Sequence, residues 1–434
     1  MKKILILALL LTTTFSAYSQ QPLSDSTAYY FDAYKAACNK DKGMLWGVDL
    51  YLNQTIFDEE TRNVTCNFKD TLGILHPFNN LFFGYLPDTL KPEKLGNAVF
   101  IHHWPITSVN QCQKLGIFIH EAFHHFQDSL KLKPEGYNNQ HMNNMEARVG
   151  IRMECLLLAK SLSSDDSAIS YIKEAAKWRL WRHKLYPDGI SEEQKHELHE
   201  GLAQYTGNYI ACKYYNIKIE KPALIDYLSI LESDTSMNSS FERSFGYVSG
   251  QFYAILLDRY QPDWRKRISK DSDLAEVLSN DLGLTIDTCK LDLLNSYKKN
   301  SSFLAIYKEE QVRKLRFDNY KQSLLQNFDK NTSLYIERDE SCRFQFNPRT
   351  MLTFEDGSFY FPYFKATGKW GEIMVSNGGG IFYESNIRVG IAYKNLVVND
   401  AQIVNPQNWT LTLRKGWHIL AKDGSYYLTS TSHN

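Results

Sequence analysis

The sequence has no excess of charge of either sign. Its 434 residues include 49 Lys plus Arg and 49 Asp plus Glu, so the formal net charge is zero. Proteins that bind nucleic acid or an anionic membrane surface through their overall charge carry a basic excess or a basic amphipathic stretch. This sequence has neither feature, so we expect no nucleic-acid partner and no binding to a membrane surface.

Cysteine is scarce and scattered. The chain has seven cysteines, and no two of them form a Cys-x-x-Cys pair. This spacing argues against a cysteine zinc site and against a thioredoxin-like motif. The odd count leaves at least one thiol free, and we interpret most of the seven as small buried hydrophobic residues. One or two disulfides would suit an exported protein, but the sequence does not pair them.

Long hydrophobic runs are also missing, apart from a short one at the start of the chain. Lys2 and Lys3 precede the apolar run Ile4–Leu11, and Ala17-Tyr18-Ser19 fits a small-x-small cleavage site. This pattern predicts a signal peptide over residues 1–19. The run is too short to span a bilayer comfortably, and no Cys follows the cleavage site closely. We therefore expect an exported protein, periplasmic or extracellular, without a stable membrane anchor.

Apolar material is sufficient for several hydrophobic cores, because 43% of the residues are hydrophobic and 14% are aromatic. We predict an α+β multidomain fold. Residues 20–106 read as a mixed α/β part, and residues 107–330 read as mainly helical. From residue 331 to 434, short alternating runs are separated by turns such as Asp356-Gly357, which predicts an all-β domain, a sandwich or a barrel.

The mixed α/β part contains three stretches with strand character: Leu45–Leu52, Val64–Phe68 and Asn97–Trp104. The third leads almost directly into the helix that carries the main motif. It is therefore a candidate to hold a substrate backbone by strand addition. We interpret His102 and His103 as ordinary strand histidines rather than as metal ligands.

The motif His120-Glu121-x-x-His124 lies in an apolar stretch. A capping box at Ser108 predicts a helix that continues to about Leu130. Residues four apart share one face of a helix, so both imidazoles can bind one metal ion. The intervening Glu is placed to accept a proton from a metal-bound water. Buried polar side chains need partners, and a metal ion would supply them.

Two carboxylates are candidates for a third ligand. Glu200 is followed by small residues, including Gly201 and Gly207, which allow its helix to approach another helix closely. Ser191 is predicted to cap that helix. Glu146, on an earlier helix, is the rival, because either carboxylate would suit zinc.

The motif followed by Glu200 on a separate helix resembles the gluzincin zinc metallopeptidases. Glu200-Gly201-Leu202-Ala203 is similar to the Asn-Glu-Gly-Phe-Ala segment that supplies the third ligand in the alanyl-aminopeptidase family. The wider run resembles an uncharacterised family of secreted bacterial proteins. The resemblance implies that residues 20–330 form a zincin-like catalytic region. It also implies one zinc ion per chain, bound by His120, His124 and Glu200.

The same resemblance implies two catalytic roles. Glu121 would be the general base, and a downstream tyrosine would donate a hydrogen bond to the oxyanion. We choose Tyr247, on a helix predicted over Ser244–Tyr260, with Tyr205 second. The chain departs from the alanyl aminopeptidases in two respects. Its third-ligand Glu lies 76 residues after His124, and the Gly-x-Met-Glu-Asn segment that binds a free amino end is absent before the motif.

These observations predict an exported zinc metallopeptidase with peptide or protein substrates. Two alternatives stay open at this point. One is an exported binding or interaction protein with an inactive zincin-like domain. The other is a zinc hydrolase of a non-peptide substrate. The C-terminal β domain has no catalytic constellation, and we expect it to contact a partner or the catalytic region.

Overall fold

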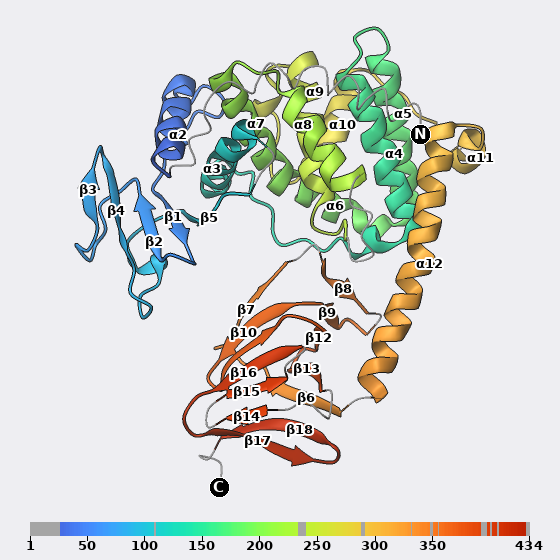
Figure 1. Cartoon of the computed structure of the whole chain (residues 1–434). Helices are drawn as coiled ribbons and strands as arrows, with labels where there is room; N and C mark the ends of the chain where they lie inside the picture. The colour runs from blue at the N-terminus through green and yellow to red at the C-terminus, as the bar shows by residue number, and fades with distance from the viewer. Residues whose placement is uncertain are drawn as a thin grey trace. The chain divides into compact units, whose positions relative to one another are not determined.

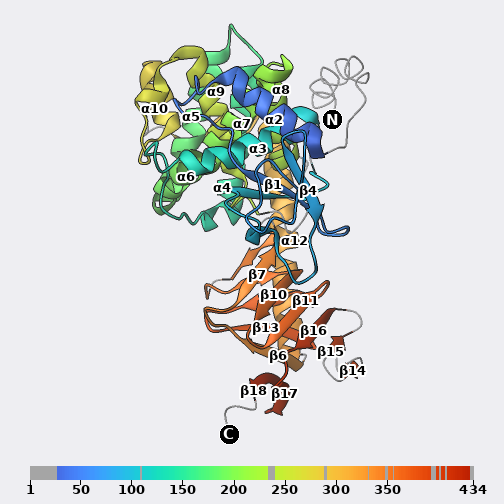
Figure 2. The same cartoon turned by 90° about the vertical axis from the view of Figure 1, so that its left-hand side faces the viewer.

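The structure is a computed structural model that describes residues 27–107, 110–232, 240–287, 291–330, 332–347, 350–354, 356–391, 397–399, 402–405 and 408–430. The predicted signal peptide lies outside these residues. The chain divides into two compact units. One comprises Met1–Phe126 with Thr206–Ile217, and the other comprises Gln127–Tyr205 with Lys218–Asn434. Figures 1 and 2 show a sheet, a group of helices and a second β-rich region, which confirms the predicted α+β multidomain class.

A five-stranded sheet belongs to the first unit, in the order β3-β4-β2-β1-β5 (Figure 1, blue). Its strands are β1 (Gln54–Asp58), β2 (Asn63–Cys66), β3 (His76–Phe78), β4 (Leu81–Tyr85) and β5 (Phe100–Trp104). β5 runs parallel to β1, and the other neighbours are antiparallel. β5 is an edge strand, so its outer side presents backbone groups to which another strand could pair. The strand predicted over Asn97–Trp104 is confirmed from Phe100 onward.

Two helices of the same unit share an aromatic core. They are α2 (Thr27–Asp41) and α3 (Gln111–Phe126), and α3 carries the predicted metal motif. The fully buried ring of Phe118 on α3 contacts three rings of α2, those of Tyr30, Phe31 and Tyr34. The Gln54 side chain in β1 donates to the Phe118 carbonyl at 2.8 Å. The motif helix is thus buried, as predicted. It ends at Phe126 rather than near Leu130, and Ser108 lies outside the described residues.

The strand predicted over Leu45–Leu52 is wrong. This stretch forms turns and irregular backbone, and the first strand begins at Gln54. Gly43 and Gly47 have φ of 69° and 76°, in the left-handed region, which breaks an extended run. Trp46 instead packs on Phe123 of α3, and its indole N–H donates to Thr206 at 2.9 Å. The apolar side chain that suggested a strand is used to pack on the motif helix.

The motif helix approaches a second helix, α7 (Leu202–Tyr215), very closely. A β-carbon added to Gly207 would lie 2.4 Å from the carbonyl oxygen of Gly116, and one added to Gly116 would lie 3.3 Å from the Asn208 side chain. Only a residue without a side chain allows such contact between two backbones. The close approach predicted from the small residues after Glu200 is therefore confirmed.

The second unit holds most of the helices, as predicted for residues 107–330. They are α4 (Met145–Leu162), α5 (Ala168–Leu185), α6 (Ile190–His196), α8 (Glu220–Tyr227), α9 (Phe245–Tyr260), α10 (Leu274–Asp281), α11 (Leu293–Tyr297) and α12 (Ser301–Lys330). α6, the π-helical turn η4 (Glu197–Gly201) and α7 follow one another without a break. One continuous helical segment therefore runs from residue 190 to residue 215. Ser191 is not its N-cap, because the segment begins at Ile190 after Gly189.

Two mainly antiparallel sheets form the C-terminal region, and they share one hydrophobic core. Their orders are β14-β15-β16-β11-β10-β7 and β17-β18-β6-β13-β12-β9-β8 (Figure 1, orange to red). The strands are β6 (Thr332–Glu337), β7 (Arg343–Phe346), β8 (Leu352–Thr353), β9 (Phe359–Phe361), β10 (Phe364–Gly368), β11 (Gly371–Val375), β12 (Gly380–Phe382), β13 (Asn386–Ile391), β14 (Val397–Asn399), β15 (Gln402–Asn405), β16 (Trp409–Leu413), β17 (Trp417–Lys422) and β18 (Ser425–Ser430). Buried residues of both sheets meet, including Ile336, Phe382, Ile373 and Trp409. A core enclosed between two sheets is that of a sandwich.

The long helix α12 packs on this region through its second half. Leu324 and Phe328 form a small core with Tyr360 and Ile381 of the second sheet. The boundary predicted at residue 331 therefore follows a helix that already packs on the sheet. Among the described residues, no helix combines the length and the apolar character needed to cross a bilayer.

Candidate metal centre

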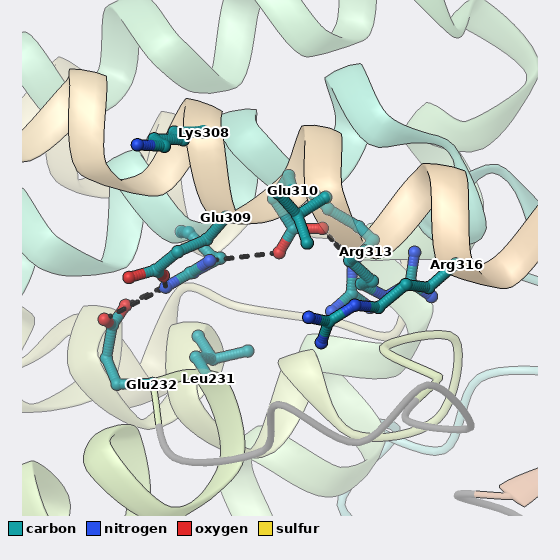
Figure 3. A pocket seen from close by; sticks show the side chains of 10 residues that line it. Leu231, Glu232, Lys308, Glu309, Glu310, Arg313 and Arg316 are labelled. Carbon is teal, nitrogen blue, oxygen red and sulfur yellow. Dashed lines mark hydrogen bonds and ion pairs between the residues drawn. The ribbon is translucent and has the colours of Figure 1, made fainter.

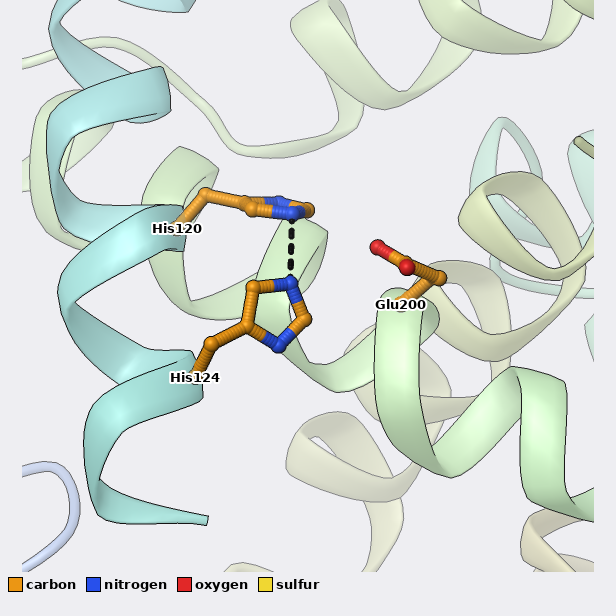
Figure 4. Close-up of side chains that lie close together, drawn as sticks. All are labelled: His120, His124 and Glu200. Atoms are coloured by element: carbon orange, nitrogen blue, oxygen red, sulfur yellow. Dashed lines mark hydrogen bonds between the residues drawn. The ribbon is translucent and has the colours of Figure 1, made fainter. Parts of the chain in front are cut away.

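Three side chains that the sequence predicts as ligands come together. Nitrogen atoms of His120 and His124 and a carboxylate oxygen of Glu200 all lie within 4.8 Å of one another (Figure 4). The two Nε2 atoms are 3.0 Å apart, and the imidazole planes are 80° to each other. His120 is buried, whereas His124 and Glu200 are half-buried. The chain therefore contains a His-His-Glu group that could hold a metal ion.

The donor types and the spacing of the two imidazoles fit such an ion. Two ligands bound to one tetrahedral zinc ion at about 2.0–2.1 Å lie about 3.3 Å apart. The 3.0 Å between the two Nε2 atoms is close to this value. A carboxylate as third ligand leaves the fourth position for water or substrate, which is the arrangement of catalytic zinc sites.

The glycine contact between α3 and α7 has a register that matches the meeting of these residues. The two helices run antiparallel, and the Gly116 backbone lies against Gly207 and Asn208. Because the helices are antiparallel, each turn toward the C-terminus of α3 faces a turn closer to the N-terminus of the other helical segment. Two turns beyond Gly116, His124 faces Glu200. The positions of His124 and Glu200 therefore match the register of the glycine contact.

The π-helical turn that carries Glu200 is held by a side chain from just beyond the motif helix. Gln127 is fully buried, and its amide donates to the carbonyls of Leu198 and His199 at 3.0 and 2.9 Å. A π-helical turn widens the helix and changes the pairing of its carbonyl groups, and such turns are frequent at functional sites. Gln127 satisfies two carbonyls at this point and so fixes the backbone next to Glu200.

The Glu200 carboxylate has two further neighbours. The Tyr137 hydroxyl donates to Glu200 Oε1 at 3.4 Å, and His199 Nδ1 lies 3.3 Å from the same oxygen. The Tyr137 ring stacks on the buried ring of His196 at 4.7 Å. Burial and the Glu200 charge raise the pKa of the Tyr137 hydroxyl. Sequence reasoning missed Tyr137 because it lies in an irregular loop outside any motif.

Two other carboxylates of the same helical segment have different partners. Glu197 accepts from Arg179 at 2.9 Å to each oxygen, and Glu193 accepts from Arg182 at 2.9 and 2.6 Å. All four side chains are buried. Burial would raise the pKa of Glu193, but the charge of Arg182 and hydrogen bonds from two histidines lower it well below its usual range. These pairs attach the 190–215 segment to α5, which carries both arginines.

The tyrosines proposed as oxyanion donors differ in position. Tyr205 is buried, and its hydroxyl donates to Asp258 at 2.5 Å and also contacts Arg265. The Tyr205 hydroxyl therefore interacts with Asp258 and Arg265 rather than with the metal group. Tyr247 on α9 is half-buried, and its ring lies 6.1 Å from that of His196. Its role stays a prediction. α9 itself contacts the Glu200 segment closely, since a β-carbon on Gly201 would lie 2.6 Å from Gly246 and Gly250 backbone atoms.

The other candidate ligands lie elsewhere. Glu146 is exposed and interacts with Tyr186, and it is not a member of the His-His-Glu group. His102 is buried in β5 and hydrogen-bonds Gln54 at 2.9 Å, and burial lowers its pKa to about 3. His103 is exposed and pairs with Glu59. Both histidines lie in β5, as predicted for this stretch.

A separate cavity of about 260 Å³ lies between α4, α12 and the turn η5 (Leu228–Glu232) (Figure 3). Arg148 Nε donates to Glu310 at 2.7 Å, and Arg152 donates to Glu310 at 3.1 Å. Arg152 also contacts Glu232 and Glu309. These ion pairs attach α12 to α4, which gives both arginines a structural role.

No family model matches the chain, and searches of curated proteins and of solved structures likewise find no match. The geometry of the His-His-Glu group therefore carries the functional argument.

Proposed function

We propose that this protein is an exported, zinc-dependent metallopeptidase of the gluzincin type, acting in the periplasm or outside the cell on peptide or protein substrates. The observation that carries the proposal is the convergence of His120, His124 and Glu200 within 4.8 Å, on two helices in tight contact. The His120-Glu121-x-x-His124 motif, followed later in the chain by Glu200, supports the same assignment.

A zinc ion bound by these three side chains would supply a Lewis acid and a water molecule of lowered pKa. Glu121, next to His120 on α3, would accept the proton of that water and pass it to the leaving amine. Tyr247 would donate a hydrogen bond to the oxyanion. The free edge of β5 would pair with the substrate backbone and align it.

The decisive experiment compares the wild-type protein with Glu121→Gln. We expect about one zinc per chain in both proteins, since Glu121 is not a ligand. Cleavage of an unstructured protein such as casein should fall by about 10³-fold in the variant, because general-base catalysis contributes about 10²–10⁴-fold. Equal cleavage by both proteins would refute the proposal.

The same experiment separates the alternatives. Zinc bound without cleavage of any peptide in a random library would favour a zinc hydrolase of a non-peptide substrate. Absence of bound zinc in a protein refolded with excess zinc would favour a binding protein, with the β-rich region as its contact surface.

A further inference from the structure

Two cysteines meet in the contact between the metal-motif helix and its partner. Cys112 lies in the first turn of α3 and Cys212 in the last turns of α7, and their Sγ atoms are 3.4 Å apart. Neither cysteine is in a disulfide in this structure, and both are buried. The sulphur atoms of a disulfide are about 2.0 Å apart. The observed separation is thus about 1.4 Å longer than that bond.

This contact distinguishes the pair from the other cysteines. Six cysteines fall in the described part of the chain, and all six are buried. Cys66 contacts the Thr55 hydroxyl at 3.3 Å, and Cys342 contacts a backbone carbonyl. Within those residues, Cys112 and Cys212 are the pair whose sulphur atoms are in contact. The structure thus supplies a pairing that spacing in the sequence does not.

The pair also occupies a particular place in the helix register. One turn beyond Cys112 on α3 is Gly116, which contacts Asn208, one turn before Cys212. Two further turns along the same antiparallel contact are His124 and Glu200. A covalent link at one end of this contact would therefore fix the register that brings the ligands together at the other end.

We propose that Cys112 and Cys212 form a disulfide when the chain folds in an oxidising compartment. The two thiols lose two protons and two electrons, and the S–S bond forms. The electrons pass to a disulfide oxidant, such as a thiol–disulfide oxidoreductase or oxidised glutathione, which is reduced to two thiols. Because both thiols are buried in the folded chain, the exchange takes place before α3 and α7 finish packing. The link spans 100 residues of sequence.

The test uses the full mature chain without metal. The protein is unfolded in denaturant and refolded with oxidised and reduced glutathione. It is then alkylated and digested, and the peptides are identified by mass spectrometry. We expect a Cys112–Cys212 linked peptide in nearly all molecules, and a melting temperature on the order of 5–10 °C above that of the reduced protein. The matched control Cys38→Ala, buried in the same unit, should keep the link, whereas Cys112→Ala should lose it.

Alkylation of both Cys112 and Cys212 in the oxidatively refolded protein would overturn the proposal, and so would pairing of either residue with another cysteine. If the cysteine variants fold poorly, the wild-type peptide map alone still decides the pairing. The link is read without zinc, so its absence would leave the proposed peptidase function untouched. Conversely, a protein that binds no zinc could still show the link.

Discussion

Three of the four glutamates in the helical segment of residues 190–215, namely Glu193, Glu197 and Glu200, have two different kinds of partner. Glu193 and Glu197 are buried against arginines, which neutralise them within the protein. Glu200, at the π-helical turn, faces two imidazole nitrogens instead. The residue type is the same in all three cases, so the partners decide the role. Carboxylates paired with arginine hold the helix, and the carboxylate beside the histidines belongs to a group that could hold a metal ion.

The largest effects should come from removing one carboxylate of each kind, Glu193 or Glu200. Glu193→Ala leaves Arg182 buried without that partner, and we expect the free energy of unfolding to fall by about 3–5 kcal/mol. Glu200→Ala should cost the metal-free protein less than about 1 kcal/mol but should abolish tight zinc binding. Denaturant unfolding and zinc titration of both variants measure the two effects. Equal loss of stability in both variants would contradict the distinction between a structural Glu193 and a metal-binding Glu200.

The helix contact that places Glu200 can be tested at Gly207. In Gly207→Ala the new methyl group lies too close to the Gly116 carbonyl oxygen, so the helices must separate. We expect a loss of about 1–3 kcal/mol in stability together with weaker zinc binding. Gly390→Ala in β13, where the nearest atom is 3.9 Å away, is the matched control. Wild-type zinc affinity in Gly207→Ala would show that the contact does not set the register.

A smaller effect is expected at Tyr137. Tyr137→Phe keeps the ring stacked on His196 and removes only the hydroxyl that donates to Glu200. Hydrogen bonds to metal ligands typically contribute about 10–100-fold in metal affinity, and we expect the lower end of that range because this bond is long. Competition with a chelator measures the affinity. Tyr247→Phe should show the reverse pattern, with unchanged zinc affinity and slower turnover.

The smallest effect concerns pH. The folded-state pKa of Glu193 lies well below its ordinary value of 4.5. A lowered folded-state pKa means that its stabilising contribution is present above pH 4.5 and is lost as the pH falls below it. The slope from this group is at most about 1.4 kcal/mol per pH unit. Acid unfolding of Glu193→Gln should therefore show a shallower pH dependence than wild type, and an unchanged slope would contradict the pairing.

The features that sequence reasoning predicted depend on short-range patterns. The spacing of His120 and His124 predicted that these two side chains share one face of a helix, and the small residues after Glu200 predicted a close helix contact. The resemblance to gluzincins, rather than spacing, favoured Glu200 over Glu146 as the third member of the group. The features it missed depend on tertiary structure. Trp46 packs on Phe123 rather than in a strand, and Tyr137 reaches Glu200 from a loop. No local pattern encodes either contact, because each partner is distant in the sequence.

The central claim is that Glu200 completes a metal site with the two histidines. An anomalous-difference map at the zinc absorption edge, from crystals of residues 20–434 soaked in zinc, tests it most directly. We predict one peak per chain, within about 2.0–2.2 Å of His120, His124 and Glu200 ligand atoms. A peak bound by Glu146, or no peak beside the two histidines, would contradict the account.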